Sequence, residues 1–113
     1  MDGGLSILNA FLPSLEAHIS SGNITLLTGT AVEGPIQNTR GDVVRVTASN
    51  SADIQDFRGR NTVLASGGCA ANPRLFEELH GGSLYAQTGF PTSQGYGLLL
   101  GMSAGGAIIG GEK

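Results

Sequence analysis

The stretch TVLASGGCAANP, residues 62–73, decides how this chain folds. Residues 62–65 carry no charge and begin with two β-branched side chains, which is typical of a strand covered on both faces. Gly67 and Gly68 follow, and glycine permits a positive φ or the close approach of a ligand to the backbone. The pattern therefore predicts a buried strand over residues 62–66 that ends in a binding turn.

The end of the same stretch has the residues that start a helix. Asn72 suits the N-cap and Pro73 the first turn, so we expect a helix over residues 74–79. In open α/β sheets, ligands bind beyond the carboxyl ends of the strands, and the two glycines, Gly67 and Gly68, lie at such an end. The alternative is a tight strand-to-helix turn that binds nothing.

The first thirty residues predict a helix and then a strand. Apolar side chains recur at three- and four-residue steps, which predicts an amphipathic helix from about Leu5 to Ser20. Pro13 removes one backbone donor, so either the helix kinks there or a second, shorter helix begins there. Residues 24–30 are an apolar, β-branched run of strand length.

The middle of the chain alternates between polar and apolar residues, as half-exposed strands do. We expect strands over residues 42–47 and 54–57, and residues 39–42 have the composition of a hairpin turn. These segments predict a β-meander that leads into the strand at residues 62–66.

The last third of the chain is uncharged and rich in glycine. No formally charged residue lies between Leu79 and Gly111, and 12 of the 19 glycines lie from Gly67 onward, which indicates tight backbone turns. We expect a loop over residues 80–90 and a glycine-rich helix over residues 95–107. Glycine and serine dilute this segment, and its length is near the lower limit for crossing a bilayer, so a membrane span is a minor alternative.

Composition argues against several classes of protein. The formal net charge is −3 and the six basic residues are scattered, so we expect neither nucleic acid nor an anionic membrane as a partner. The single cysteine, Cys69, excludes a disulfide framework and suits the cytoplasm, and we expect it to pack as a small hydrophobic side chain. His18 and His80 have no metal-ligand spacing with Cys69, so no metal site is predicted. A length of 113 residues suits one domain.

Three motifs, taken in their order and spacing, resemble those of a known family. They are LASGG at residues 64–68 with Asn72 four residues on, SQGYG at residues 93–97, and SAGGA at residues 103–107. In these motifs the chain is similar to the flavoprotein subunits related to fumarate reductase and succinate dehydrogenase, a group that includes 3-ketosteroid dehydrogenases and tricarballylate dehydrogenase. Upstream, residues 24–32 and 41–46 resemble a strand and the β-meander of that family, so the likeness covers nearly the whole chain.

The chain departs from the family in two respects. Tyr96 stands where the family usually has an aspartate, so the resemblance implies no polar role for this position. The amino-terminal Gly-x-Gly-x-x-Gly motif of the family and its later acid/base residues are absent from this sequence. We therefore expect the chain to be a middle segment of a longer flavoprotein.

The resemblance implies an α/β fold, namely a partial Rossmann-like FAD-binding domain with a β-meander, over residues 1–113. The parent enzyme would use FAD to transfer a hydride between the flavin and a C–C bond next to a carbonyl or carboxylate. No catalytic residue is expected in this chain, which alone would be inactive. The implied cofactor contacts are Ala31 and Val32 at the adenine end, Ala65, Ser66, Gly67 and Gly68 along the dinucleotide, and Gly95 and Gly97 near the flavin.

A second interpretation does not involve a cofactor. The glycines of residues 95–107 would then only permit close packing of a helix, and the chain would be a non-catalytic, self-associating α/β domain. In either case the uncharged segment from Leu79 to Gly111 offers no electrostatic barrier to association, so we expect a homodimer or a larger assembly.

Overall fold

The computed structural model describes residues 3–83 and 90–110. The chain divides into two compact units, Met1–Thr30 and Ala31–Lys113, and each is described by itself. The described residues contain three helices and one three-stranded antiparallel sheet, so the expectation of a mixed α/β chain is confirmed. None of these helices has the length and apolar character that crossing a membrane requires.

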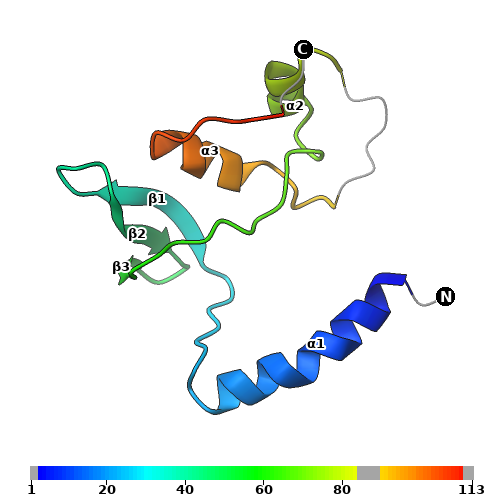
Figure 1. The fold of residues 1–113 in the computed structure, drawn as a ribbon, viewed down its shortest axis with the longest axis vertical. Coiled ribbons are helices and arrows are strands. Elements are labelled where there is room, and N and C mark those ends of the chain that lie inside the picture. Colours follow the sequence, from blue (N-terminus) through cyan, green and yellow to red (C-terminus); the bar gives the residue numbers. More distant parts are fainter. Residues whose placement is uncertain (1–2, 84–89, 111–113) are drawn as a thin grey trace. The chain divides into compact units, whose positions relative to one another are not determined.

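The first unit is built around one helix, α1 (Gly3–Ser20), which Figure 1 draws in blue. The helix continues through Pro13, so the alternative of two shorter helices is wrong; the proline removes one hydrogen bond and the turns on either side persist. The helix ends at Ser20 and is followed by Gly22, where φ is 76°, and the amide of Asn23 donates to the carbonyl of His18 at 3.0 Å. A left-handed glycine with this bonding is a common helix terminus.

The strand predicted over residues 24–30 is absent, and this segment has no regular secondary structure. Its side chains have the composition of a strand, but a strand also needs a neighbour whose backbone groups can pair with its own. No such neighbour exists for it among the described residues.

The second unit contains the sheet and two short helices. The sheet order is β1 (Ala31–Gln37), β2 (Val43–Ser49) and β3 (Ile54–Arg58), with antiparallel neighbours throughout. A β-meander is therefore present, and the strands predicted over residues 42–47 and 54–57 are confirmed as β2 and β3, whereas the sequence does not predict β1. The helices are α2 (Pro73–His80), close to its predicted range of 74–79, and α3 (Tyr96–Ser103), which ends four residues before the helix predicted over residues 95–107.

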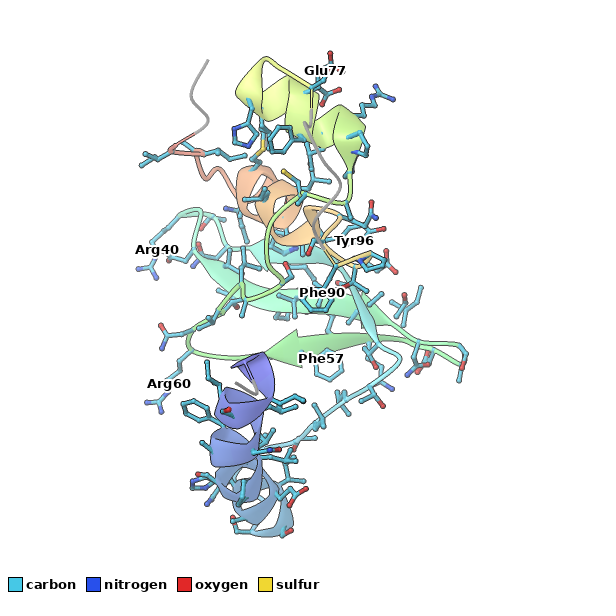
Figure 2. The ribbon with its side chains drawn as sticks, turned by 90° about the vertical axis from the view of Figure 1, so that its right-hand side faces the viewer. Arg40, Phe57, Arg60, Glu77, Phe90 and Tyr96 are labelled. Atoms are coloured by element: carbon cyan, nitrogen blue, oxygen red, sulfur yellow. The ribbon has the colours of Figure 1, made fainter. Side chains whose placement is uncertain are left out.

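The two faces of the sheet differ in polarity. On one face, Arg45 pairs with Asp56 at 3.0 Å, and the hydroxyl of Thr47 donates to the same carboxylate at 2.9 Å. The other face presents apolar side chains such as Val46 and Ala48 of β2, and α3 lies over it on the side of β1 (Figure 1, Figure 2). An antiparallel sheet with one apolar face packs against a helix on that face only.

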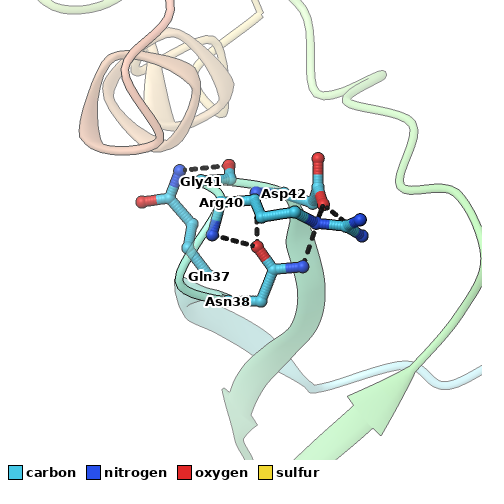
Figure 3. A network of polar contacts seen from close by, with 5 residues as sticks. All are labelled: Gln37, Asn38, Arg40, Gly41 and Asp42. Carbon is cyan, nitrogen blue, oxygen red and sulfur yellow. Dashed lines mark hydrogen bonds and ion pairs between the residues drawn. The ribbon is translucent and has the colours of Figure 1, made fainter.

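A polar turn joins β1 to β2 (Figure 3). The side-chain oxygen of Asn38 accepts from the amides of Arg40 and Asp42 at 2.9 and 3.0 Å, and the side-chain nitrogen of Asn38 donates to the Asp42 carboxylate at 2.9 Å. Gly41 supplies a φ of 87°. The turn predicted from residues 39–42 is therefore confirmed, although Asn38, which organises it, lies outside that prediction. We call residues 37–42 the hairpin turn.

The strand predicted over residues 62–66 is also absent. The segment has no pairing partner in the described sheet, and its side chains are exposed, Val63 by 84% and Leu64 by 51%. Three hydrophobic side chains are buried among the described residues, namely Ala48, Cys69 and Leu75. The apolar composition that predicts a strand covered on both faces therefore belongs to a segment whose side chains are largely exposed, although Leu64 lies against α3.

Candidate functional site

Residues 67–72 begin with two glycines, and we call this segment the glycine turn. Gly67 and Gly68 lie next to the start of α3. Gly67 has a φ of 77°, and the carbonyl of Gly68 accepts a hydrogen bond from the amide of Gly95 at 3.0 Å. Gly95 in turn has a φ of 83° and occupies the N-cap position of α3. One hydrogen bond thus joins two left-handed backbone turns that are far apart in the sequence.

Side-chain amides strengthen this connection. Asn72 accepts from the amide of Leu75 at 3.1 Å, so the predicted N-cap of α2 is confirmed, and the same side chain donates to the carbonyl of Gln94 at 3.1 Å. Gln94 donates to the carbonyls of Ala71 and Pro91 at 3.1 and 2.8 Å. Side chains from both segments, Asn72 of the glycine turn and Gln94 before α3, therefore hold the two segments together.

Of the cavities that border the segment before the glycine turn, two are lined by Ser66. The β1 cavity has a volume of about 420 Å³ and lies between β1, residues 63–66 and α3. The α3 cavity has a volume of about 320 Å³ and lies between Ser66, α3 and the segment that follows α3. Ser66 lines both cavities, as does Leu64.

The eight predicted cofactor contacts all lie in or beside this region. Ala31, Val32, Ala65 and Ser66 line the β1 cavity, and Ser66, Gly67 and Gly97 line the α3 cavity. Gly68 lines a third cavity of about 320 Å³ together with Cys69 and His80. Gly95 is buried at the start of α3. The structure thus brings together residues from three separate parts of the sequence, and their role as cofactor contacts stays a prediction.

Packing requires glycine at position 95 and leaves little room for a side chain at position 97. A Cβ atom on Gly95 would overlap with Leu75 and lie 2.9 Å from the Cβ of Cys69, and one on Gly97 would overlap with the hydroxyl of Ser66. The close-packing interpretation of these glycines therefore has a physical basis in the structure. Gly68 differs, because a Cβ atom there would meet nothing within 4 Å.

The first turn of α3 has backbone amides that no carbonyl within the helix can pair. No side chain of the described residues caps this helix, and its first turn lies beside the glycine turn. Free amides at a helix N-terminus, with the partial positive charge of the helix dipole, attract anionic groups such as phosphates. Apart from Glu33, the residues that line the β1 and α3 cavities carry no charge.

Cys69 is buried and is a free thiol. The cavity beside it is lined mainly by apolar residues, including Phe76, Leu98 and Ile108. This is the environment expected for a cysteine that packs as a small hydrophobic side chain. Within the described part of the chain, no group of three or more His, Cys, Asp or Glu residues is arranged to hold a metal ion.

Sequence reasoning missed three residues of this region. Gln94 joins two loops, and nothing in its local sequence distinguishes it from other polar loop residues. Gln37 donates to the carbonyl of Ala104 at 3.0 Å and so connects the hairpin turn to the end of α3. Glu33 lines the β1 cavity beside Gly34-Pro35, a pair that is unusual inside a strand and is a signal for a bulge.

The comparisons with known proteins give no family assignment. No protein-family model matches the chain, and no curated protein matches it significantly.

Proposed function

We propose that this chain supplies part of the FAD site of a longer flavoprotein that resembles fumarate reductase and succinate dehydrogenase. Its second unit would belong to a Rossmann-like FAD-binding domain. The enzyme would move a hydride between the flavin and a C–C bond next to a carbonyl or carboxylate. The flavin supplies the hydride chemistry, and the protein binds and orients the cofactor.

One observation carries this proposal. Ser66, at the end of the uncharged segment and directly before Gly67, lines both the β1 cavity and the α3 cavity. A dinucleotide is an elongated ligand with a ring system at each end, so a site for it needs two spaces joined by backbone without obstructing side chains. The glycine turn and the uncapped start of α3 provide such backbone, and both contain residues that the resemblance implies as cofactor contacts.

The exposed segment at residues 62–66 supports a larger sheet. The segment is apolar and is not helical, and it is not paired with any strand in the described part of the chain. Neighbouring strands from the rest of a Rossmann-like domain would satisfy its backbone groups and cover both of its faces. Val63 and Leu64 would then be buried.

This chain's own residues would bind the cofactor and leave the proton transfers to other parts of the enzyme. Of the residues that line the two cavities, Glu33 is the one acidic residue, and it already accepts a hydrogen bond from the hydroxyl of Ser49. No proton donor for the reaction is assigned to this chain.

Visible absorption of the purified protein tests the proposal. The longer polypeptide that contains this sequence should retain flavin through purification, whereas the 113-residue chain alone should bind FAD weakly or not at all. In the longer protein, Gly67→Val should abolish flavin retention, because a branched side chain opposes a φ of 77° and fills space beside the ligand.

A matched variant controls for backbone strain. Gly41→Val places the same side chain at a φ of 87° in the hairpin turn, away from both cavities, and should leave the flavin in place. A folded Gly67→Val protein with its full flavin content would show that the glycine turn does not contact the cofactor.

A non-catalytic, self-associating domain is the second candidate, and the exposed apolar side chains favour it. Val63 and Ile109 are exposed by 84% and 96%. A second copy could cover them, with the region from Gly95 to Ile109 or the segment near Thr62 in the interface. Sedimentation across a dilution series should find a homodimer or a larger assembly, and a monomer at every concentration would exclude this candidate.

A further inference from the structure

The two edges of the sheet differ in how readily another strand can pair with them. On the β1 edge, Pro35 has no amide hydrogen to donate, and a bulge at Glu33 interrupts the register with β2. The β3 edge has neither a proline nor a bulge. An edge strand presents a row of backbone amides and carbonyls that no neighbouring strand pairs with. Within the described residues of the second unit, no strand pairs with the outer side of β3, so this edge can accept a further strand.

The side chains of β3 fit a second copy of the same strand. Asp56 and Arg58 lie on the polar face of the sheet, and Phe57 between them lies opposite Val46 on the apolar face (Figure 2). Two copies of β3 that run antiparallel, with the two Phe57 residues opposite each other, bring each Asp56 opposite the partner's Arg58. This pairing is self-complementary, as a two-fold interface requires.

Arg58 has no counter-charge of its own within the described residues. Its register partner on β2 is Arg45, so two guanidinium groups lie opposite each other on one face, an arrangement that destabilises a sheet. The carboxylate of Asp56 accepts from Arg45 and from Thr47, and no described side chain forms an ion pair or hydrogen bond with the guanidinium of Arg58. A carboxylate has about four acceptor sites, so Asp56 has room for a second arginine.

We propose that the β3 edge is the docking surface for a second copy of this chain, paired antiparallel about Phe57. The two three-stranded sheets then join into one. On its polar face the partner's Asp56 neutralises Arg58, and on its apolar face the two Phe57 rings pack together. Each strand has five residues, so the interface belongs to the small, transient class. This inference does not depend on the flavin site.

Disulfide cross-linking of the full 113-residue chain tests the register. All variants carry Cys69→Ser, so the introduced cysteine is the only thiol. Phe57→Cys should form a covalent dimer on mild oxidation, because Cα atoms directly opposite each other in an antiparallel pair lie within the range that a disulfide spans. Gln55→Cys is the matched control on the same face of β3. Its two copies would lie about 13 Å apart along the strands, so this variant should stay uncross-linked.

Sedimentation of charge variants tests the ion pairs. Arg58→Asp should weaken self-association by about tenfold, because it places like charges opposite each other at two positions. Arg40→Asp makes the same change of charge in the hairpin turn and should leave self-association unchanged. An equimolar mixture of Arg58→Asp and Asp56→Arg chains should associate more tightly than either variant alone, because each charge again lies opposite one of the other sign.

If Asp56→Arg fails to fold by circular dichroism, the combination of Phe57→Cys with Arg58→Asp keeps Asp56 and should cross-link less than Phe57→Cys alone. Equal cross-linking of Phe57→Cys and Gln55→Cys, or none in either, would overturn the inference. So would equal self-association of Arg58→Asp and Arg40→Asp. Ile109→Cys tests the interface that the self-associating candidate uses, and cross-linking there without cross-linking at position 57 would overturn the inference as well.

Discussion

The hairpin turn and the glycine turn both contain a glycine with positive φ, yet they are stabilised over very different distances in the sequence. In the hairpin turn, the side chain of Asn38 bonds to groups two and four residues away. In the glycine turn, Asn72 and Gln94 bond across 22 and 23 residues. The hydrogen bonds of Asn38 therefore form within the hairpin turn itself, whereas the glycine turn is stabilised only when the segment that contains Gln94 packs against it.

This difference in the range of the hydrogen bonds predicts which segments of the second unit a mutation should loosen. A change at Asn38 should loosen only the hairpin turn, because the bonding partners of its side chain, Arg40 and Asp42, lie in the same turn. A change at the junction of the glycine turn and α3 should loosen both segments, because each is the other's partner.

Gly95→Val should have the largest effect on stability. The new side chain would overlap with Leu75 and Cys69, and a φ of 83° is strained for a β-branched residue. Overpacking and backbone strain together should lower the free energy of unfolding by about 3 kcal/mol or more, measured by chemical denaturation.

Gly105→Val is its control. Gly105 has a φ of 86°, but a Cβ atom there meets nothing within 4 Å. Only backbone strain remains, so the loss should be about 1–2 kcal/mol. Equal losses for the two variants would mean that Gly95 is not packed against Leu75 and Cys69.

Asn72→Ala should have the next largest effect. It removes the N-cap of α2 and the bond to the Gln94 carbonyl, which together stabilise by about 2 kcal/mol. Hydrogen exchange should rise both in the glycine turn and around Gln94.

Asn38→Ala provides the comparison within the hairpin turn. Its loss should be about 1 kcal/mol, since the site is exposed to water, and faster exchange should stay within residues 37–42. Faster exchange at Gln94 in this variant would contradict the distinction between the two turns.

Cys69→Ser should have a smaller effect. The buried thiol would become a hydroxyl among apolar side chains, at a cost of about 1 kcal/mol in the free energy of unfolding. Turnover of the longer flavoprotein should remain nearly unchanged. A loss of turnover with the cofactor still bound would make the thiol catalytic.

Arg40→Ala should have the smallest effect. The ion pair between Arg40 and Asp42 measures 3.0 Å, but its side chains are 81% and 56% exposed. Exposed pairs of this kind contribute little, so the melting temperature should shift by no more than the equivalent of about 0.5 kcal/mol. A larger shift would show that the arginine organises the hairpin turn.

The elements that the sequence predicted correctly are those whose signals are local. The helix over Pro73–His80 follows from Asn72 as N-cap and Pro73 in the first turn, and the hairpin follows from the residues at its turn. Each of these signals acts within a few residues, through a hydrogen bond or a fixed dihedral angle. Pro13 shows the limit of such signals, because α1 continues past it.

The errors concern strands that have no partner. Residues 24–30 and 62–66 have the composition of strands, but neither is paired in the described part of the chain. Strand formation requires backbone hydrogen bonds to another segment, and composition does not say whether that segment is present.

For the candidate site, the sequence by itself determined which residues have little side-chain bulk and where the backbone can turn. Only the tertiary structure decided that Ser66 lines two cavities, that Gln94 braces the glycine turn, and that Glu33 shares a cavity with Tyr96. The physical reason is distance along the chain. A turn or a cap is stabilised by neighbours that the local sequence specifies, whereas a cavity is formed by segments that meet only when the chain has folded.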